Sequence, residues 1–85
     1  MAIIRRLNFF DRIERVKGDT FVLTESNEVL GYITTLPTAG NPHKINIMRL
    51  MFRQDCNDDA KQLVKYIIAK YGAKGASSFH VLIDE

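Results

Sequence analysis

The sequence of 85 residues lacks several features that mark particular classes of protein. It has a single cysteine, Cys56, which excludes an internal disulfide and fits a reducing compartment. It has no signal-peptide pattern, and no apolar run approaches the roughly 20 residues that a membrane-spanning helix needs. Repeats and low-complexity segments are also missing. We therefore expect a cytoplasmic protein with no membrane contact.

The sequence also lacks a strong excess of one charge. Twelve basic and ten acidic side chains leave a net charge of +2, which is too small to indicate a nucleic-acid partner. RNA recognition by a sheet needs exposed aromatic residues in a recognisable motif, and we find none. The basic side chains are explained by a solvated surface. With 46% hydrophobic residues, the chain suits one globular domain over residues 1–85.

The second half of the sequence predicts a helix with a wide apolar stripe. The stripe consists of residues at helical spacing, namely Ala60, Leu63, Val64, Ile67, Ile68 and Tyr71. Asn57 is suited to cap the helix N-terminus, and Asp58 and Asp59 suit the positive end of the helix dipole. Gly72 can adopt the left-handed conformation that ends a helix. We therefore expect the helix to run from Asn57 to Tyr71.

Strands are predicted on both sides of this helix. Residues 44–53 form a long strand with apolar side chains on both faces, which is typical of a central strand. The alternation places Ile45, Ile47 and Met51 on one face and Met48, Leu50 and Phe52 on the other. Residues 78–84 form a second strand. A strand, a helix and a strand in this order predict two parallel neighbours joined by the helix.

The start of the chain predicts a short strand and a second helix. Residues 2–6 are expected to form the strand. Residues 7–16 carry apolar side chains at helical spacing, namely Phe9, Phe10, Ile13 and Val16. Asn8 is suited to cap this helix, and Gly18 follows its expected end.

The middle of the chain predicts a hairpin. Residues 20–24 and 29–36 are rich in β-branched and aromatic residues and are expected to form antiparallel strands joined by a turn at residues 25–28. Residues 37–42 contain two prolines and a glycine and are expected to form an exposed loop. Together these elements predict an α+β fold with a mixed, mostly antiparallel sheet and about two helices.

Three segments of the chain are similar to parts of one known family. Residues 28–33 (EVLGYI) resemble its middle strand, residues 49–53 (RLMFR) its cofactor-facing strand, and residues 63–76 (LVKYIIAKYGAKGA) the helix after its pyrophosphate loop. In this order the segments resemble the central part of a GNAT-family N-acetyltransferase, over roughly residues 20–84. The resemblance implies a partial or reduced acetyltransferase-like domain that lacks the family's C-terminal helix and strands.

The resemblance also implies a cofactor and a place for it. In the family two parallel strands splay apart, and the pantetheine arm of acetyl-CoA takes the gap like a substitute strand. By resemblance, Leu50, Met51 and Phe52 face this arm, and a backbone N–H polarises the thioester carbonyl when an amine attacks. Arg53 is the candidate cation near the phosphates. The alternative is that these residues are only central-strand core, and the sequence identifies neither the acceptor amine nor a catalytic residue.

One segment departs from the family pattern. The family has a glycine-bearing loop whose backbone N–H groups bind the pyrophosphate at the helix N-terminus. Residues 53–60 instead contain no glycine and three aspartates, Asp55, Asp58 and Asp59. Because carboxylates repel phosphates, we expect acetyl-CoA to bind weakly. The simpler role of these aspartates is to stabilise the helix N-terminus.

Other candidate sites have less support in the sequence. The acidic segment follows the spacing of a calcium loop only in part, because Ala60 replaces the required glycine and Tyr66 the final glutamate. Neither His43 nor His80 has the spacing of a metal ligand, so no metal site is expected. Cys56 is expected to be a plain reduced thiol. The alternative to catalysis is a non-catalytic interaction domain that forms a homodimer through its unfinished sheet edge.

Overall fold

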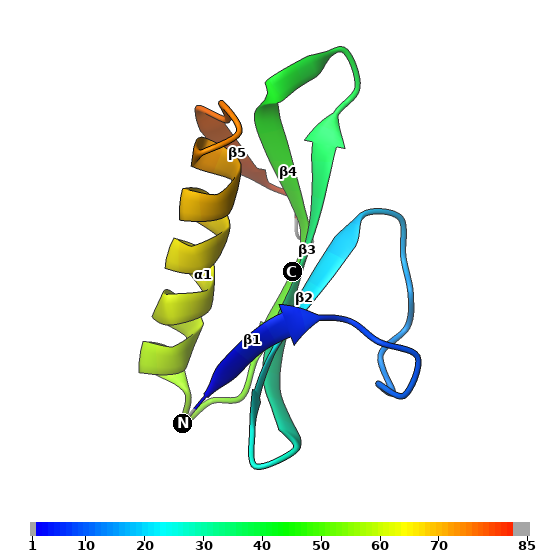
Figure 1. Cartoon of the computed structure of the whole chain (residues 1–85), viewed down its shortest axis with the longest axis vertical. Coiled ribbons are helices and arrows are strands. Elements are labelled where there is room, and N and C mark those ends of the chain that lie inside the picture. Colours follow the sequence, from blue (N-terminus) through cyan, green and yellow to red (C-terminus); the bar gives the residue numbers. More distant parts are fainter. Residues whose placement is uncertain (1, 83–85) are drawn as a thin grey trace.

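The expected strands form one sheet, which the computed structural model describes over residues 2–82. The elements follow in the order β1 (Ile3–Arg6), β2 (Asp19–Glu25), β3 (Glu28–Thr38), β4 (Asn41–Phe52), α1 (Asn57–Gly72) and β5 (Ser78–Val81). The strands have the same order in the sheet; β1 to β4 are antiparallel to their neighbours, and β5 is parallel to β4 (Figure 1). The predicted α+β fold is confirmed, although residues 2–82 contain one helix rather than about two.

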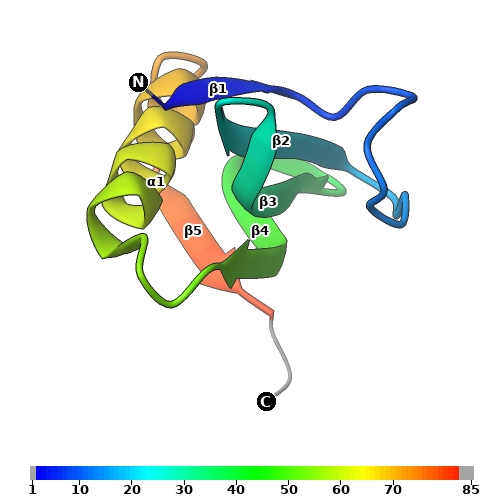
Figure 2. The same ribbon diagram turned by 90° about the horizontal axis from the view of Figure 1, so that it is seen from below.

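Helix α1 covers one face of the sheet, as both views of the ribbon show (Figures 1 and 2). Its apolar stripe buries Leu63, Ile67 and Tyr71 against the sheet. The sheet side of this core consists mainly of Phe21, Leu23, Ile33, Ile45 and Ile47. The Tyr71 hydroxyl keeps a partner inside the core, because it shares a hydrogen bond of 2.5 Å with the Thr35 hydroxyl. Each fully buried aliphatic side chain contributes roughly 1.5–3 kcal/mol to folding.

The ends of α1 correct two predictions. The helix begins at Asn57 itself, so Cys56 occupies the cap position and no side chain caps the first turn. Gly72 is the last helical residue, and the Ala73 after it keeps a right-handed backbone with φ −63°. The left-handed residue is Gly75, with φ +96°. The helix continues past the predicted end because the Ala73 N–H still finds a helical carbonyl.

The predicted turn between β2 and β3 is confirmed. Ser26 and Asn27 both have positive φ values, 51° and 68°. This is the conformation of a two-residue type I′ turn, whose twist matches the right-handed twist of the two strands. Asparagine adopts such a backbone more readily than most residues because its short side chain forms local hydrogen bonds.

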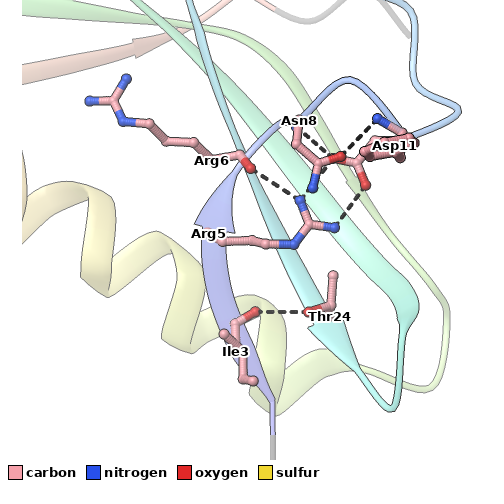
Figure 3. A network of polar contacts seen from close by, with 7 residues as sticks. Ile3, Arg5, Arg6, Asn8, Asp11 and Thr24 are labelled. Atoms are coloured by element: carbon pink, nitrogen blue, oxygen red, sulfur yellow. Dashed lines mark hydrogen bonds and ion pairs between the residues drawn. The ribbon is translucent and has the colours of Figure 1, made fainter.

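The helix predicted for residues 7–16 is wrong, because turns occupy this part of the connection between β1 and β2 (Figure 3). Asn8 Oδ1 accepts a hydrogen bond of 2.9 Å from the backbone N–H of Phe10. The N–H of Asn8 donates to the Asp11 carboxylate at 2.8 Å. Local bonds of this kind between side chain and backbone compete directly with helix formation.

A contact with the sheet fixes the same turns in place. Arg5 of β1 donates two hydrogen bonds of 2.8 Å to the two Asp11 oxygens. Phe9 and Phe10 contact each other edge to face, and they are 86% and 87% exposed. The helical spacing of these aromatic residues therefore does not lead to a buried helix face.

The loop predicted for residues 37–42 is also shorter than expected. Strands β3 and β4 extend into it from both sides, so only Ala39 and Gly40 join them. Pro37 and Pro42 consequently lie within strands. Pro37 is paired on the β4 side only, and Pro42 lies in an irregular part of β4 where the pairing with β3 shifts. A proline is tolerated there because an edge without a neighbour needs no N–H donor.

Strand β4 contains a bulge. In its pairing with β3, Arg49 lies opposite Thr34, whereas Ile47 lies opposite Thr35. Met48 is therefore an extra residue without a partner across the pair. Such a bulge reverses the alternation of side chains between the two faces of the sheet.

The bulge corrects the predicted faces of β4. Leu50 and Phe52 lie on the side of α1, where they line a groove together with residues of the first half of the helix. Ile45 and Ile47 lie on the same side, in the core beneath α1. Met51 lies on the opposite face and is 57% exposed. The prediction that Leu50 and Phe52 face away from Ile45 and Ile47 is therefore wrong.

The predicted parallel pair is confirmed. β5 pairs with β4 over Ser78–Val81, opposite residues 44–47. The end of the strand predicted for residues 78–84 lies outside the described residues. No helix within residues 2–82 has the length and apolar character needed to cross a membrane.

Candidate functional site

The candidate site begins where β4 and β5 stop pairing. The last ladder pair is Ile47 with Val81, and the Leu82 N–H donates a further bond of 2.9 Å to the Ile47 carbonyl. β4 continues to Phe52 with β3 on one edge. On its other edge, no residue of the described chain pairs with Arg49–Phe52. Within the described chain, the last four residues of β4 therefore present an open edge next to a parallel strand.

The alternation of backbone groups identifies which residues face this open edge. The Arg53 N–H donates to the Leu30 carbonyl of the neighbouring chain segment at 3.0 Å. In an antiparallel pair every second residue directs its N–H and C=O to the partner. Arg53 and Met51 therefore direct their backbone groups toward β3, whereas Phe52 and Leu50 direct theirs to the open edge. These groups are available to a ligand that lies along β4.

An apolar groove of about 330 Å³ lies between this part of β4 and the first half of α1. It is lined by Leu50, Phe52, Ala60, Lys61, Val64 and Lys65. Strand residues supply one wall, and one face of the first two helical turns supplies the other. The lysine stems add apolar surface while their ammonium groups reach toward solvent.

The structure brings together two of the four residues predicted to contact a cofactor. Leu50 and Phe52 line the groove. Met51 lies on the opposite face of the sheet, in a smaller cavity beside Tyr32. Arg53 lies at the end of β4 and contacts Glu28 at 3.1 Å. The cofactor role of these residues stays a prediction.

The N-terminus of α1 lies at one end of the groove. Asp58 and Asp59 lie in its first turn, as the dipole argument predicts. The first turn has no side-chain cap, and Ala60 is the first residue whose N–H reaches the Cys56 carbonyl, at 2.8 Å.

Cys56 does not provide a reactive thiol at this end of the site. It is buried, and burial together with the neighbouring Asp55 carboxylate raises the pKa of its thiol. Its Sγ donates a hydrogen bond of 3.4 Å to Asp55 Oδ1. A protonated thiol is a poor nucleophile and a poor metal ligand. Residues 2–82 also contain no group of three or more His, Cys, Asp or Glu side chains that could hold a metal ion.

A polar cluster on the other face of the sheet was not predicted from the sequence. Arg49 Nε donates to the Thr34 hydroxyl at 3.1 Å, and its Nη2 donates to the Thr20 hydroxyl at 3.4 Å. The two hydroxyls are 2.7 Å apart, and the guanidinium lies over the Tyr32 ring at 5.0 Å from its centroid. The available signal was a charged residue in the middle of a predicted central strand, where a charge needs partners.

Several solved structures have the same fold. A GNAT family acetyltransferase from Elizabethkingia anophelis with acetyl-CoA bound matches with a TM-score of 0.75 and 15% identity, covering 94% of this chain and 63% of that chain. An IAA acetyltransferase from Bacillus cereus matches with a TM-score of 0.72 and 20% identity, covering 95% of this chain and 65% of that chain. An aminoglycoside acetyltransferase from an uncultured soil metagenomic sample, in complex with sisomicin, matches with a TM-score of 0.67 and 15% identity. This match covers 99% of this chain and 78% of that chain.

These matches show that the chain has the fold of the GNAT acetyltransferases, which confirms the resemblance predicted from the sequence. The chain spans less than two thirds of the length of the first two proteins. No protein-family model matches the sequence, and neither does any curated protein.

Proposed function

We propose that this chain is an acetyltransferase-like domain that binds acetyl-CoA along the open edge of β4. The observation that carries the proposal is the combination of this edge with the apolar groove beside it. The backbone groups of Leu50 and Phe52 are free to pair with the amides of a pantetheine arm, which takes the place of a neighbouring strand. The similar protein from Elizabethkingia anophelis was crystallised with acetyl-CoA bound.

The groove suits the other parts of the same ligand. Its apolar wall, formed by Phe52 and Val64, contacts the methylene groups of the arm, and the ammonium groups of Lys61 and Lys65 lie near the phosphates. A backbone N–H at the open edge polarises the thioester carbonyl. The nitrogen of an acceptor amine then attacks the carbonyl carbon, the carbon–sulfur bond breaks, the amine loses a proton, and the released thiolate takes one up.

The acidic residues at the helix N-terminus limit the affinity. Asp58 and Asp59 lie where the pyrophosphate is expected, and Arg53 already contacts Glu28 at 3.1 Å and Asp55 at 3.9 Å. Both contacts are exposed and contribute little to holding the arginine in place. We therefore expect a dissociation constant for acetyl-CoA in the high micromolar range or above, at roughly −5 kcal/mol.

Titration calorimetry with acetyl-CoA tests the proposal. The double variant Asp58→Asn and Asp59→Asn is expected to bind about 3- to 10-fold more tightly, because two negative charges near the phosphates are removed. Ala60→Phe places a ring in the groove and is expected to weaken binding by about 10-fold or more. Ala69→Phe is the matched control, because Ala69 is exposed on the same helix away from the groove. Equal affinities of the two phenylalanine variants would place acetyl-CoA elsewhere.

The second candidate function is a non-catalytic domain that forms a homodimer. The observation in its favour is the exposure of Val81 and Leu82 at the end of β5, 59% and 53%, next to the open edge of β4. A second copy can cover such an edge by strand pairing. Sedimentation equilibrium at tens of micromolar protein distinguishes the candidates. A dimer that does not bind acetyl-CoA, and that does not dissociate when acetyl-CoA is added, favours this second function.

A further inference from the structure

The polar cluster around Arg49 holds a guanidinium in a fixed orientation on the face of the sheet opposite α1. Three strands contribute to it: Arg49 comes from β4, Tyr32 and Thr34 from β3, and Thr20 from β2. The central carbon of the guanidinium lies over the Tyr32 ring, and the two threonine hydroxyls accept bonds from two of its nitrogens. The contact with the ring and the two hydrogen bonds restrict the guanidinium, so its remaining donors are already oriented for a partner.

A count of donors and acceptors shows what this partner must supply. The guanidinium has five N–H groups, and two are used, so three remain on Nη1 and Nη2. Thr34 is completely buried, and its hydroxyl shares one hydrogen bond of 2.7 Å with the Thr20 hydroxyl, in which either can be the donor. The proton of the hydroxyl that accepts this bond is then left over as well. The cluster therefore has surplus donors, which indicates that it suits an oxyanion.

The acidic residues near this face are engaged by other arginines. Both Asp11 oxygens accept from Arg5, and Asp19 contacts Arg6 at 3.3 Å. None of the ion pairs within residues 2–82 includes Arg49. A partly buried arginine without a carboxylate partner is unusual, because a partly desolvated charge is normally paired.

We propose that Arg49 binds a carboxylate on the acceptor, so that the acceptor is an amine that also carries a carboxylate group. This interpretation of the ligand rests on the proposed acetyl-CoA function, whereas the oxyanion site rests on the Arg49 cluster itself. The planar fork of an arginine matches a carboxylate with two parallel hydrogen bonds. Arg49 directly precedes Leu50, whose backbone faces the open edge. A ligand held by Arg49 thus lies on the face of β4 opposite the cofactor groove, beside the same strand segment.

NMR spectroscopy of the ¹⁵N-labelled chain tests this site without any catalysis. The probes are phenylalanine and phenylalaninamide, which differ in the carboxylate alone, and inorganic phosphate as a different oxyanion. Phenylalanine is expected to shift the Arg49 Nε–H signal in a saturable way at millimolar concentrations, and phenylalaninamide is expected not to shift it. A larger response to phosphate than to phenylalanine would overturn the carboxylate assignment, and so would equal responses to the two amines.

Variants separate this inference from the proposed function. Arg49→Gln is expected to weaken phenylalanine binding about 10-fold, and Arg49→Lys, which keeps the charge but loses the fork, by about 3-fold or more. Arg12→Gln is the control, because Arg12 is an exposed arginine whose loss removes the same charge. Acetyl-CoA affinity is measured in every variant and is expected not to change. If the unmodified chain does not bind acetyl-CoA, the proposed function alone is contradicted. If a folded Arg49→Gln variant binds phenylalanine as tightly as the unmodified chain does, the carboxylate site alone is contradicted.

Discussion

Replacing Gly18 with alanine is expected to lower the free energy of unfolding by about 3 kcal/mol or more. Two effects add at this position. Gly18 has φ +117°, a backbone conformation that residues with a Cβ rarely adopt. An added Cβ would also lie 2.4 Å from the Thr35 carbonyl oxygen, which belongs to the paired backbone of β3 and cannot move away without breaking the ladder. Urea denaturation followed by circular dichroism measures the change.

Gly40→Ala is the control for this prediction. Gly40 also has a positive φ, +77°, but an added Cβ meets no atom within 4 Å. The substitution therefore tests backbone strain without the steric clash, and we expect it to cost about 1 kcal/mol. If both substitutions cost the same, the close approach of Gly18 to β3 contributes nothing and the steric argument is wrong.

The elements whose sequence signals agree with their surroundings could be predicted from the sequence. The stripe on α1 buries one face of the helix, and the β-branched and aromatic residues of β2 and β3 lie in strands whose middle residues are largely buried, so local pattern and tertiary packing favour the same structure. The segment of residues 7–18 is different, because Asn8 and Asp11 form local turns and a contact with Arg5. The helical spacing of residues 7–16 does not reveal that Arg5 on β1 binds Asp11 and thereby favours turns over a helix.

The candidate site could be predicted in part. The resemblance placed Leu50 and Phe52 at the cofactor strand, and both line the groove. The bulge at Met48 could not be predicted, because a single extra residue in a run of apolar residues leaves no local signal. It is this bulge that turns Leu50 toward α1 and Arg49 toward the opposite face, so the polar cluster of Arg49 was missed for the same reason.

The ion pair between Arg5 and Asp11 leads to the second large prediction (Figure 3). The Asp11 side chain is 6% exposed, and its oxygens accept bonds of 2.8 Å from Arg5 and from the Asn8 N–H. The Arg5 guanidinium is the largest cause that lowers the Asp11 pKa, from 3.8 to about 2. Because one pKa unit corresponds to 1.36 kcal/mol, and Arg5 is partly exposed, we expect Asp11→Asn to lower the free energy of unfolding at pH 7 by about 2 kcal/mol.

The pH dependence of this loss identifies its cause. A carboxylate whose pKa is lower in the folded state than in the unfolded state stabilises the fold fully above pH 3.8, and this contribution disappears as the pH falls to about 2. Asp11→Asn is therefore expected to differ from the unmodified chain at pH 7 and to approach it near pH 2. Asp19→Asn is the control, because its ion pair with Arg6 is exposed on both sides and is expected to contribute less than about 0.5 kcal/mol. A difference between Asp11→Asn and the unmodified chain that is constant from pH 7 to pH 2 would show that Asp11 acts through packing of the turn rather than through its charge.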